Sequence, residues 1–293
     1  MAPPSAAGAA RPVGRGPLVV DALLYALAVG FAIVAFAPFF WAVTTSLMKL
    51  TDIMVVPPRV WPTTLEWGNY GQVFVRVPFL RWVGNTVQVT VLATLGTLVS
   101  ATLVAYSFAR FRYPGRDLLF FVTVGTLILP AEVTVVPSYL LFRDLGWLDT
   151  YKPLVVPFWL GGGPLYIFLL RQFMLGIPRD LDEAARIDGA GPLRVLIDVL
   201  APLLRPALTT VVIISAIAHW DDFFGPLIYL NTPITFTLSI GVRYFYNTLQ
   251  GEGLPTPHLL MAAATLATLP PVALFLLGQR YFVQGIVMSG LKA

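Results

Sequence analysis

Six long apolar stretches constrain this chain more than any other feature of its sequence. A helix that crosses a membrane needs about 20 predominantly apolar residues. Six segments approach or exceed this length, and we expect spans over residues 22–47, 83–109, 118–141, 153–170, 207–230 and 259–277. Because lipid offers no hydrogen bonds to the backbone, spans of this kind must be helical. The sequence therefore predicts an all-α fold, a polytopic bundle of six transmembrane helices.

Composition agrees with this class and excludes several others. The chain is 57% hydrophobic and only 12% charged, whereas a soluble domain carries about a quarter charged residues. It contains no cysteine, so disulfides and thiolate metal sites are excluded. The two histidines, His219 and His258, lie far apart in the sequence, so we predict no metal centre and no cofactor. We interpret the net charge of +4 as basic cytoplasmic loops rather than a nucleic-acid surface.

The distribution of basic residues predicts the orientation in the membrane. Residues 1–17 are rich in Ala, Pro and Gly, and we expect a disordered cytoplasmic tail there, before a transmembrane domain over 18–293. With the N-terminus inside, 12 of the 19 Lys and Arg residues fall on the cytoplasmic side and 7 outside. This bias predicts that both termini are cytoplasmic. The outer loops, 48–82 and 231–258, carry aromatic residues that either anchor at the interface or dock another protein.

The loop between the fourth and fifth spans, residues 176–206, carries the most specific signal. Asp180 is a good candidate for a helix N-cap, and Glu183 stands where a capping box would place its acidic partner. The helix would start at Leu181, and Gly189 would end it in a left-handed conformation. Isolated helices shorter than about 12–15 residues are marginal in water. We therefore expect packing on this chain or on a partner to hold it.

A second short helix is predicted immediately afterwards. Pro192 follows Gly191 and is suited to a first helical position. Pro202 and Pro206 then limit helix continuity before the fifth span. The loop thus predicts two short helices that meet at an angle and project from the membrane.

The stretches Glu183-Ala-Ala185 and Asp188-Gly-Ala190, with Pro202 after them, resemble the EAA loop of ABC importer permeases. The resemblance extends over nearly the whole chain and is nearest to the smaller permease of maltose-type carbohydrate importers. It implies the type I importer permease fold, in which the first loop helix is a coupling helix that docks on an ATPase. The coupling residues that it implies are Glu183, Ala184, Ala185, Asp188, Gly189 and Pro202.

The resemblance also implies partners. These are a second homologous permease, two ATP-binding cassette subunits, an extracytoplasmic solute-binding protein and the surrounding lipid. The chain has no Gly-x-x-x-x-Gly-Lys-Ser/Thr phosphate loop, so it is not expected to be an enzyme and ATP hydrolysis must come from a partner. The function implied is that of a permease subunit of an ATP-driven carbohydrate importer, which forms half of the pore. The transmembrane domain over 18–293 would then be the permease domain, in a bacterial inner membrane.

Three alternatives remain at this point. The same loop would serve a permease for a non-sugar solute, such as glycerol phosphate, a peptide, a metal or phosphate. An ion-coupled secondary transporter is less consistent, because no inverted repeat with broken helices is clear. An integral membrane enzyme would need a nucleophile or metal motif such as His-Glu-x-x-His or Gly-x-Ser-x-Gly, and none occurs.

Ionisable residues inside spans are candidates for the solute path. Glu132 follows Pro130 in the third span, and Trp220, Asp221 and Asp222 occur together in the fifth. A carboxylate beside an aromatic ring suits a sugar, although the carboxylates could instead reach interfacial water or cap a helix break. The maltose-type family often has Trp-Asn where this chain has Trp220-Asp221. Asp21, Arg110 and Arg171 lie at span ends, and we assign them no role beyond reaching the interface.

Overall fold

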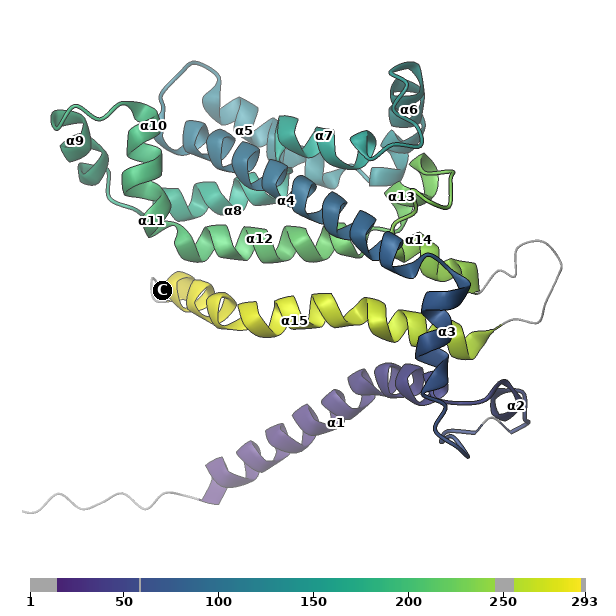
Figure 1. The fold of residues 1–293 in the computed structure, drawn as a ribbon. Coiled ribbons are helices and arrows are strands. Elements are labelled where there is room, and N and C mark those ends of the chain that lie inside the picture. The colour runs from purple at the N-terminus through teal and green to yellow at the C-terminus, as the bar shows by residue number, and fades with distance from the viewer. Residues whose placement is uncertain (1–14, 58, 246–255, 291–293) are drawn as a thin grey trace, which may run out of the picture.

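The computed structural model describes residues 15–57, 59–245 and 256–290. Within these ranges the chain is built from helices and connecting loops, with no strand, as the sequence predicts. Figure 1 shows the course of the chain. The helices are α1 (Arg15–Ser46), α2 (Leu50–Ile53), α3 (Gly68–Arg76), α4 (Phe79–Arg110), α5 (Arg116–Gly125), α6 (Ala131–Asp144), α7 (Lys152–Gly161), α8 (Pro164–Leu175), α9 (Asp180–Ile187), α10 (Pro192–Arg194), α11 (Ala201–Leu203), α12 (Arg205–Trp220), α13 (Phe224–Tyr229), α14 (Leu238–Val242) and α15 (Pro257–Gly290).

Four candidate membrane spans coincide with expected ones. They are Val20–Ser46, Phe79–Arg110, Lys152–Leu175 and Pro257–Gln279. The number rises to six if each of two sharply bent helix pairs counts as one span. The expected tail over residues 1–17 lies mostly outside the described residues, and its last three residues already belong to α1.

The third and fifth spans differ from the expected straight helices. The third bends by 102° between Ile128 and Glu132, because Pro130 lacks an N–H and disfavours a helical conformation in the residue before it. The fifth helix, α12, ends at Trp220, so the prediction that it continues to residue 230 is wrong. The Asp222 carboxylate accepts a hydrogen bond from Gly225 N–H at 3.1 Å, which favours a new helix start at this point.

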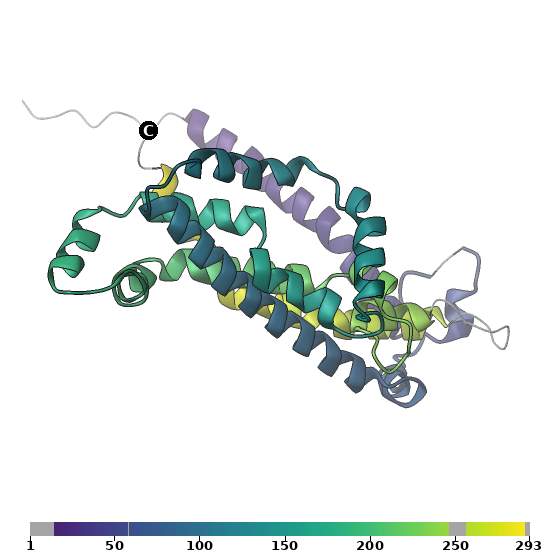
Figure 2. The ribbon, with the colours of Figure 1, turned by 90° about the horizontal axis from the view of Figure 1, so that it is seen from above.

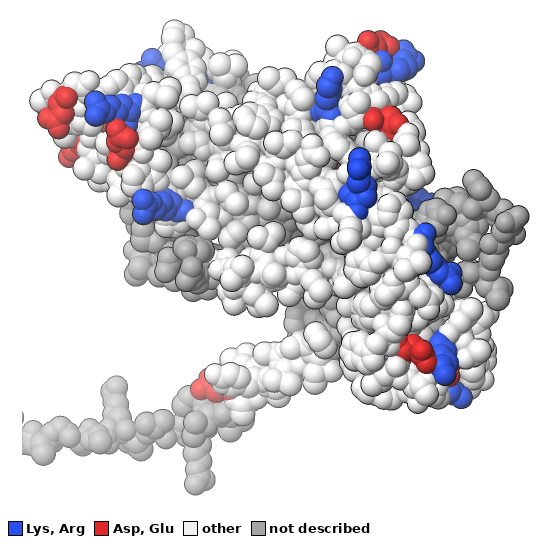
Figure 3. All heavy atoms as spheres, in the orientation of Figure 1, with Lys and Arg blue, Asp and Glu red and all other residues white. Residues whose placement is uncertain are grey.

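The long helices run between two ends of different composition. The end that carries α9 also holds the start of α1 and the end of α15, whereas α2, α3, α13 and α14 lie at the other end (Figure 1; Figure 2 from above). We label the first the inner end and the second the outer end, after the orientation that the sequence predicts. On the face in Figure 3 the charged side chains gather at these two ends, and the band between them is almost uncharged. Large apolar side chains on α1 and α5 are exposed in this single chain. This distribution is the one that a bilayer requires.

Helix α4 lies at the centre of the bundle and contacts α7, α8 and α12. Its inner end joins a buried cluster with α8, α12 and residues 195–204, and its outer end joins another with α3, α14 and α15. Gly96 allows α7 to approach closely, because a Cβ there would collide with the Trp159 ring. Trp159 Nε1–H donates to Leu92 O at 3.0 Å across the same contact.

Candidate functional site

The most distinctive feature of the inner end is the protruding helix α9. It begins at Asp180, one residue before the expected start, and no side-chain hydrogen bond caps it. The predicted capping box of Asp180 and Glu183 is therefore wrong. Arg179 occupies the N-cap position with a nearly helical backbone, and its side chain donates to Ala109 O of α4 at 3.2 Å. A contact with another helix thus fixes the start of α9, while the acidic first turn still complements the helix dipole.

The end of α9 is as the sequence predicts. Gly189 has φ +84°, a left-handed conformation that residues with a Cβ seldom adopt. Gly189 N–H donates to Arg186 O at 3.0 Å, and Ala190 N–H donates to Ala185 O at 2.9 Å. These bonds satisfy carbonyl groups that a helix end leaves free, and they reverse the chain.

The second short helix is confirmed with one addition. Gly191 is extended, and Pro192 is the first residue of α10. A π-helical segment, Val195–Leu200, follows and leads into α11, where Pro202 lies exposed. The stretch from Pro192 to Leu203 then meets α12 at 84°. We call residues 176–179, before α9, and residues 188–203, after it, the two arms of the loop. Together they carry α9 away from the bundle (Figure 1).

One face of α9 is fixed to the inner end of α4 by a buried ion pair. Arg110 Nε lies 2.9 Å from Asp182 Oδ2, and the two side chains are only 2% and 7% exposed. The contact is an ion pair and not a hydrogen bond, because the geometry at Arg110 Nε does not meet the requirements of a hydrogen bond. Arg110 Nη2 also donates to Ile177 O at 3.1 Å. Arg110 thus does more than reach the interface, and the earlier interpretation of it is corrected.

Two further contacts hold the loop against α4. The Tyr106 hydroxyl donates to Pro192 O at 3.0 Å, which attaches the second arm to the same helix end. Ala185 and Ala190 pack against the inner buried cluster. The loop is therefore supported on both arms by side chains one turn apart on α4.

The opposite face of α9 has no cover. Ile187 lies four residues after Glu183 and three after Ala184, so it shares one side of the helix with each of them, and all three are exposed. Ile187 is 86% exposed. None of the described residues bonds to the Glu183 carboxylate. We call Glu183, Ala184 and Ile187 the free face of α9. The two neighbouring alanines differ, since Ala184 lies on the free face and Ala185 packs inward.

The remaining coupling candidate, Asp188, is exposed at the C-cap of α9. With Gly189 it forms the tip where the chain turns back. All six coupling candidates therefore lie on α9 or on the arm that follows it.

The four solute-path candidates lie in different environments. Trp220 is buried against α15, and its Nε1–H donates to Ala267 O at 3.1 Å. Asp221 is exposed, and Asp222 is partly buried with its carboxylate on Gly225 N–H. Glu132 is exposed on the first turn of α6, apart in sequence from the other three. No contact between Glu132 and the other three is found in the described part of the chain.

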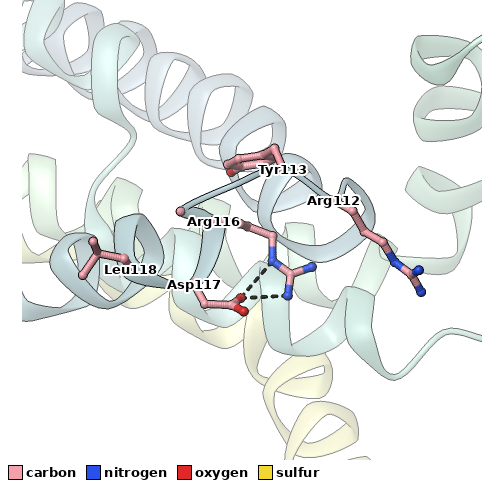
Figure 4. Close-up of a pocket in the computed structure, with 6 residues that line it drawn as sticks. Arg112, Tyr113, Arg116, Asp117 and Leu118 are labelled. Atoms are coloured by element: carbon pink, nitrogen blue, oxygen red, sulfur yellow. Dashed lines mark hydrogen bonds and ion pairs between the residues drawn. The ribbon is translucent and has the colours of Figure 1, made fainter.

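A surface hollow of about 330 Å³ lies in the loop between α4 and α5. Arg112, Tyr113, Arg116 and Asp117 contribute to its walls (Figure 4). Asp117 pairs with Arg116 at 2.7 Å, and Arg112 points away from this pair. The charges do not converge on a common ligand position, so we assign no site to the hollow. The described residues also contain no group of three His, Cys, Asp or Glu side chains that could hold a metal ion.

Comparisons with known proteins agree with this geometry. The family model described as "Binding-protein-dependent transport system inner membrane component" matches residues 99–288, which include α9 and both of its arms. The sn-glycerol-3-phosphate transport system permease protein of Rhizobium meliloti is 36% identical over 89% of this chain and 93% of its own length. The arabinooligosaccharides transport system permease protein of Halalkalibacterium halodurans is 29% identical over 92% and 97%, respectively.

A solved structure shows the same fold. A chain of a bacterial ABC transporter involved in the import of the acidic polysaccharide alginate aligns with a TM-score of 0.81. The alignment covers 93% of this chain and all of that one, at 23% identity. The fold, the family match and the similarity to permeases across nearly the whole length agree: this chain belongs to the family of binding-protein-dependent transport system inner membrane components.

Proposed function

We propose that this chain is one of two permease subunits of an ATP-driven importer, and that the free face of α9 docks on a separate ATPase subunit. The observation that carries the proposal is the division of α9 into two faces. Asp182 and Ala185 fix it to its own chain, whereas Glu183 and Ile187 are left uncovered. A single exposed isoleucine is ordinary on a protein surface, but Ile187 lies beside the exposed Glu183 and Ala184, so this face offers an apolar contact and a carboxylate together.

Each coupling residue has a definite part in this docking. Ile187 and Ala184 supply apolar contact, and the small Ala184 side chain lets another surface approach closely. Glu183 offers a carboxylate to a basic group of the partner, and Asp188 adds a second charge at the tip. Gly189 and Pro202 act indirectly, since they shape the two arms that present α9. We take the ATPase to be a separate chain, in keeping with the lack of a phosphate loop in this sequence.

The orientation follows from the same assignment. If α9 meets a cytoplasmic ATPase, the start of α1 and the end of α15 are cytoplasmic too, since they lie at the same end (Figure 1). The predicted excess of Lys and Arg on that side supports this orientation. The opposite end, with α2, α3, α13 and α14, then faces outward, where an external solute-binding protein would dock.

The proposed solute is a carbohydrate or a closely related polyol phosphate. The names of the relatives support this class, since they refer to glycerol phosphate, arabinooligosaccharides and alginate. Among the four path candidates, Asp221 and Glu132 have exposed side chains that could meet a solute, whereas Trp220 is covered by α15. Replacing Asp221 with Asn in the complete transporter should raise the solute concentration for half-maximal uptake, and an unchanged value would remove Asp221 from the path.

The docking proposal is tested by placing a charge on the free face. Ile187→Asp should reduce co-purification of the ATPase with the permease by about fivefold or more, because an aspartate would enter an apolar contact without a partner, a penalty of about 1 kcal/mol or more. Val75→Asp is the matched control, because Val75 is also 86% exposed but lies on α3 at the other end. Equal retention of the ATPase by both variants would contradict the proposal.

A further inference from the structure

Helix α4 differs from every other candidate span among the described residues in being continuous and free of proline. Its 32 residues run without a break. The others contain internal prolines, as in α1 and α15, or are interrupted, as between α7 and α8 and in the two bent pairs. At about 1.5 Å per residue α4 is about 48 Å long. An unbroken helix held on several sides is the part of a bundle that bends least.

The inner end of α4 carries the α9 loop. Arg110 and Tyr106 hold its two arms through Asp182, Ile177 O and Pro192 O. A displacement of α9 by a docked partner is therefore applied directly to α4.

The outer end of α4 carries a second irregular segment, residues 231–238, which we call the strap. Trp82 Nε1–H donates to Pro233 O at 2.8 Å. The Asn85 amide donates to Ile234 O at 2.9 Å and to Phe236 O at 2.8 Å. Thr86 Oγ1 accepts from Leu238 N–H at 2.7 Å. Three side chains within about one helical turn thus attach the strap to α4, and Asn85 and Thr86 are buried.

Asp149 holds the strap from the opposite side. Its carboxylate accepts hydrogen bonds from Asn231 N–H, Thr232 N–H and the hydroxyls of Thr232 and Thr235. Burial raises the pKa of this carboxyl, but the hydrogen bonds outweigh burial and lower the pKa to about 2. Asp149 belongs to the α6–α7 connection, so the strap joins α4 to a different part of the bundle. A shift of α4 relative to that connection must therefore deform the strap.

We infer that Trp82, Asn85 and Thr86 are positioning residues that make the outer strap move with α9, through α4. The inference rests on the proposed function, in that it takes the ATPase to displace α9. Beyond that function, the inference says that binding of nucleotide to the ATPase changes the conformation of the strap. Ile234, in the strap, is 52% exposed. The connecting peptides on either side of α9 are less suited to this transmission, since they bend at Gly176–Pro178 and at Leu204.

The experiment uses the complete transporter in nanodiscs and exploits the absence of cysteine from this chain. Ile234→Cys reports on the strap and Ile187→Cys on α9. The rate of modification by a maleimide is measured without nucleotide and with ATP and vanadate. We expect the rate at residue 234 to change by about fivefold or more between the two states, the lower range of allosteric coupling. An unchanged rate at 234, with residue 187 protected by the ATPase, would overturn the inference and leave the proposed function intact.

A second variant tests the contact itself. Asn85→Leu keeps the size of the side chain and removes both amide donors to the strap. It should cancel the nucleotide response at residue 234 and leave the protection of residue 187 unchanged. If Asn85→Leu does not assemble, Trp82→Phe removes the bond to Pro233 O together with part of a buried ring, and it should reduce the response. A full nucleotide response at residue 234 in the variant that assembles would overturn the role of these contacts. If residue 187 is not protected by the ATPase when Trp82 and Asn85 are unchanged, the docking proposal is contradicted instead.

Discussion

The buried ion pair between Arg110 and Asp182 allows a quantitative prediction. Removing one partner of such a pair leaves an uncompensated buried charge, which costs about 3–5 kcal/mol. Here the side chains are 2% and 7% exposed, but Arg110 keeps Ile177 O as a partner. We therefore expect Asp182→Leu to cost about 3 kcal/mol, the lower end of that range. This corresponds to a roughly 150-fold rise in the local opening constant of α9.

The measurement is amide hydrogen exchange over residues 180–190 in the purified complex. Arg110→Met should loosen the same segment, because it leaves the carboxylate of Asp182 buried alone. The double variant removes both charges together, and replacing a buried pair by apolar side chains is often close to neutral. Its exchange should therefore lie nearer to the wild type than that of either single variant. Single effects below about threefold, or a double effect equal to the sum of the singles, would refute the reasoning.

Three further predictions concern other parts of the bundle. Gly189→Ala should weaken α9 by about 1–2 kcal/mol, the cost of a left-handed alanine, whereas Gly191→Ala, at negative φ in open space, should have little effect on the same exchange measurement. Gly96→Ala should lower the thermal stability of the complex by forcing α7 away from α4, and Gly84→Ala on the same helix, which meets nothing within 4 Å, is its control; equal melting temperatures would contradict this packing. The pKa of Asp149 lies below its ordinary value of 3.8, so the carboxylate stabilises the strap above about pH 4 and this contribution is lost as the pH falls toward 2. The rate of amide hydrogen exchange in the strap, corrected for its intrinsic pH dependence, should stay constant from pH 7 to 5. At pH 7 this rate should be higher in Asp149→Asn than in the wild type. Faster corrected exchange in the wild-type strap at pH 5 than at pH 7 would contradict this prediction.

The local features of the site could be predicted because they depend on residues adjacent in the sequence. Gly189 and the Gly191-Pro192 pair have conformational preferences that predict the end of one helix and the start of the next, and both are confirmed. The four clear spans were predictable because a long apolar stretch has few structural alternatives.

The contacts that support the site could not be predicted in the same way. The Arg110–Asp182 pair and the Asn85–strap hydrogen bonds join segments that are distant in the sequence, and no local pattern indicates them. The capping box failed for the same reason, since Arg179 is held by α4 and sets the start of α9. The end of α12 at Trp220 was missed because residues 223–230 are apolar enough to continue the span, whereas the Asp222 carboxylate favours a new start. A carboxylate at membrane depth was the signal for a break, and the cap of a helix break was one of the two interpretations that the sequence left open.

The most direct test of the account is a cross-link from α9 to the ATPase. In the assembled transporter, Ile187→Cys treated with a short thiol-to-amine cross-linker should form a product with the ATPase subunit. Val75→Cys on α3, which has the same exposed fraction, should form none. Cross-linking of residue 187 only to lipid-facing or external components, or equal ATPase products from both positions, would contradict the assignment of the free face of α9 as the surface that receives the motion of the ATPase.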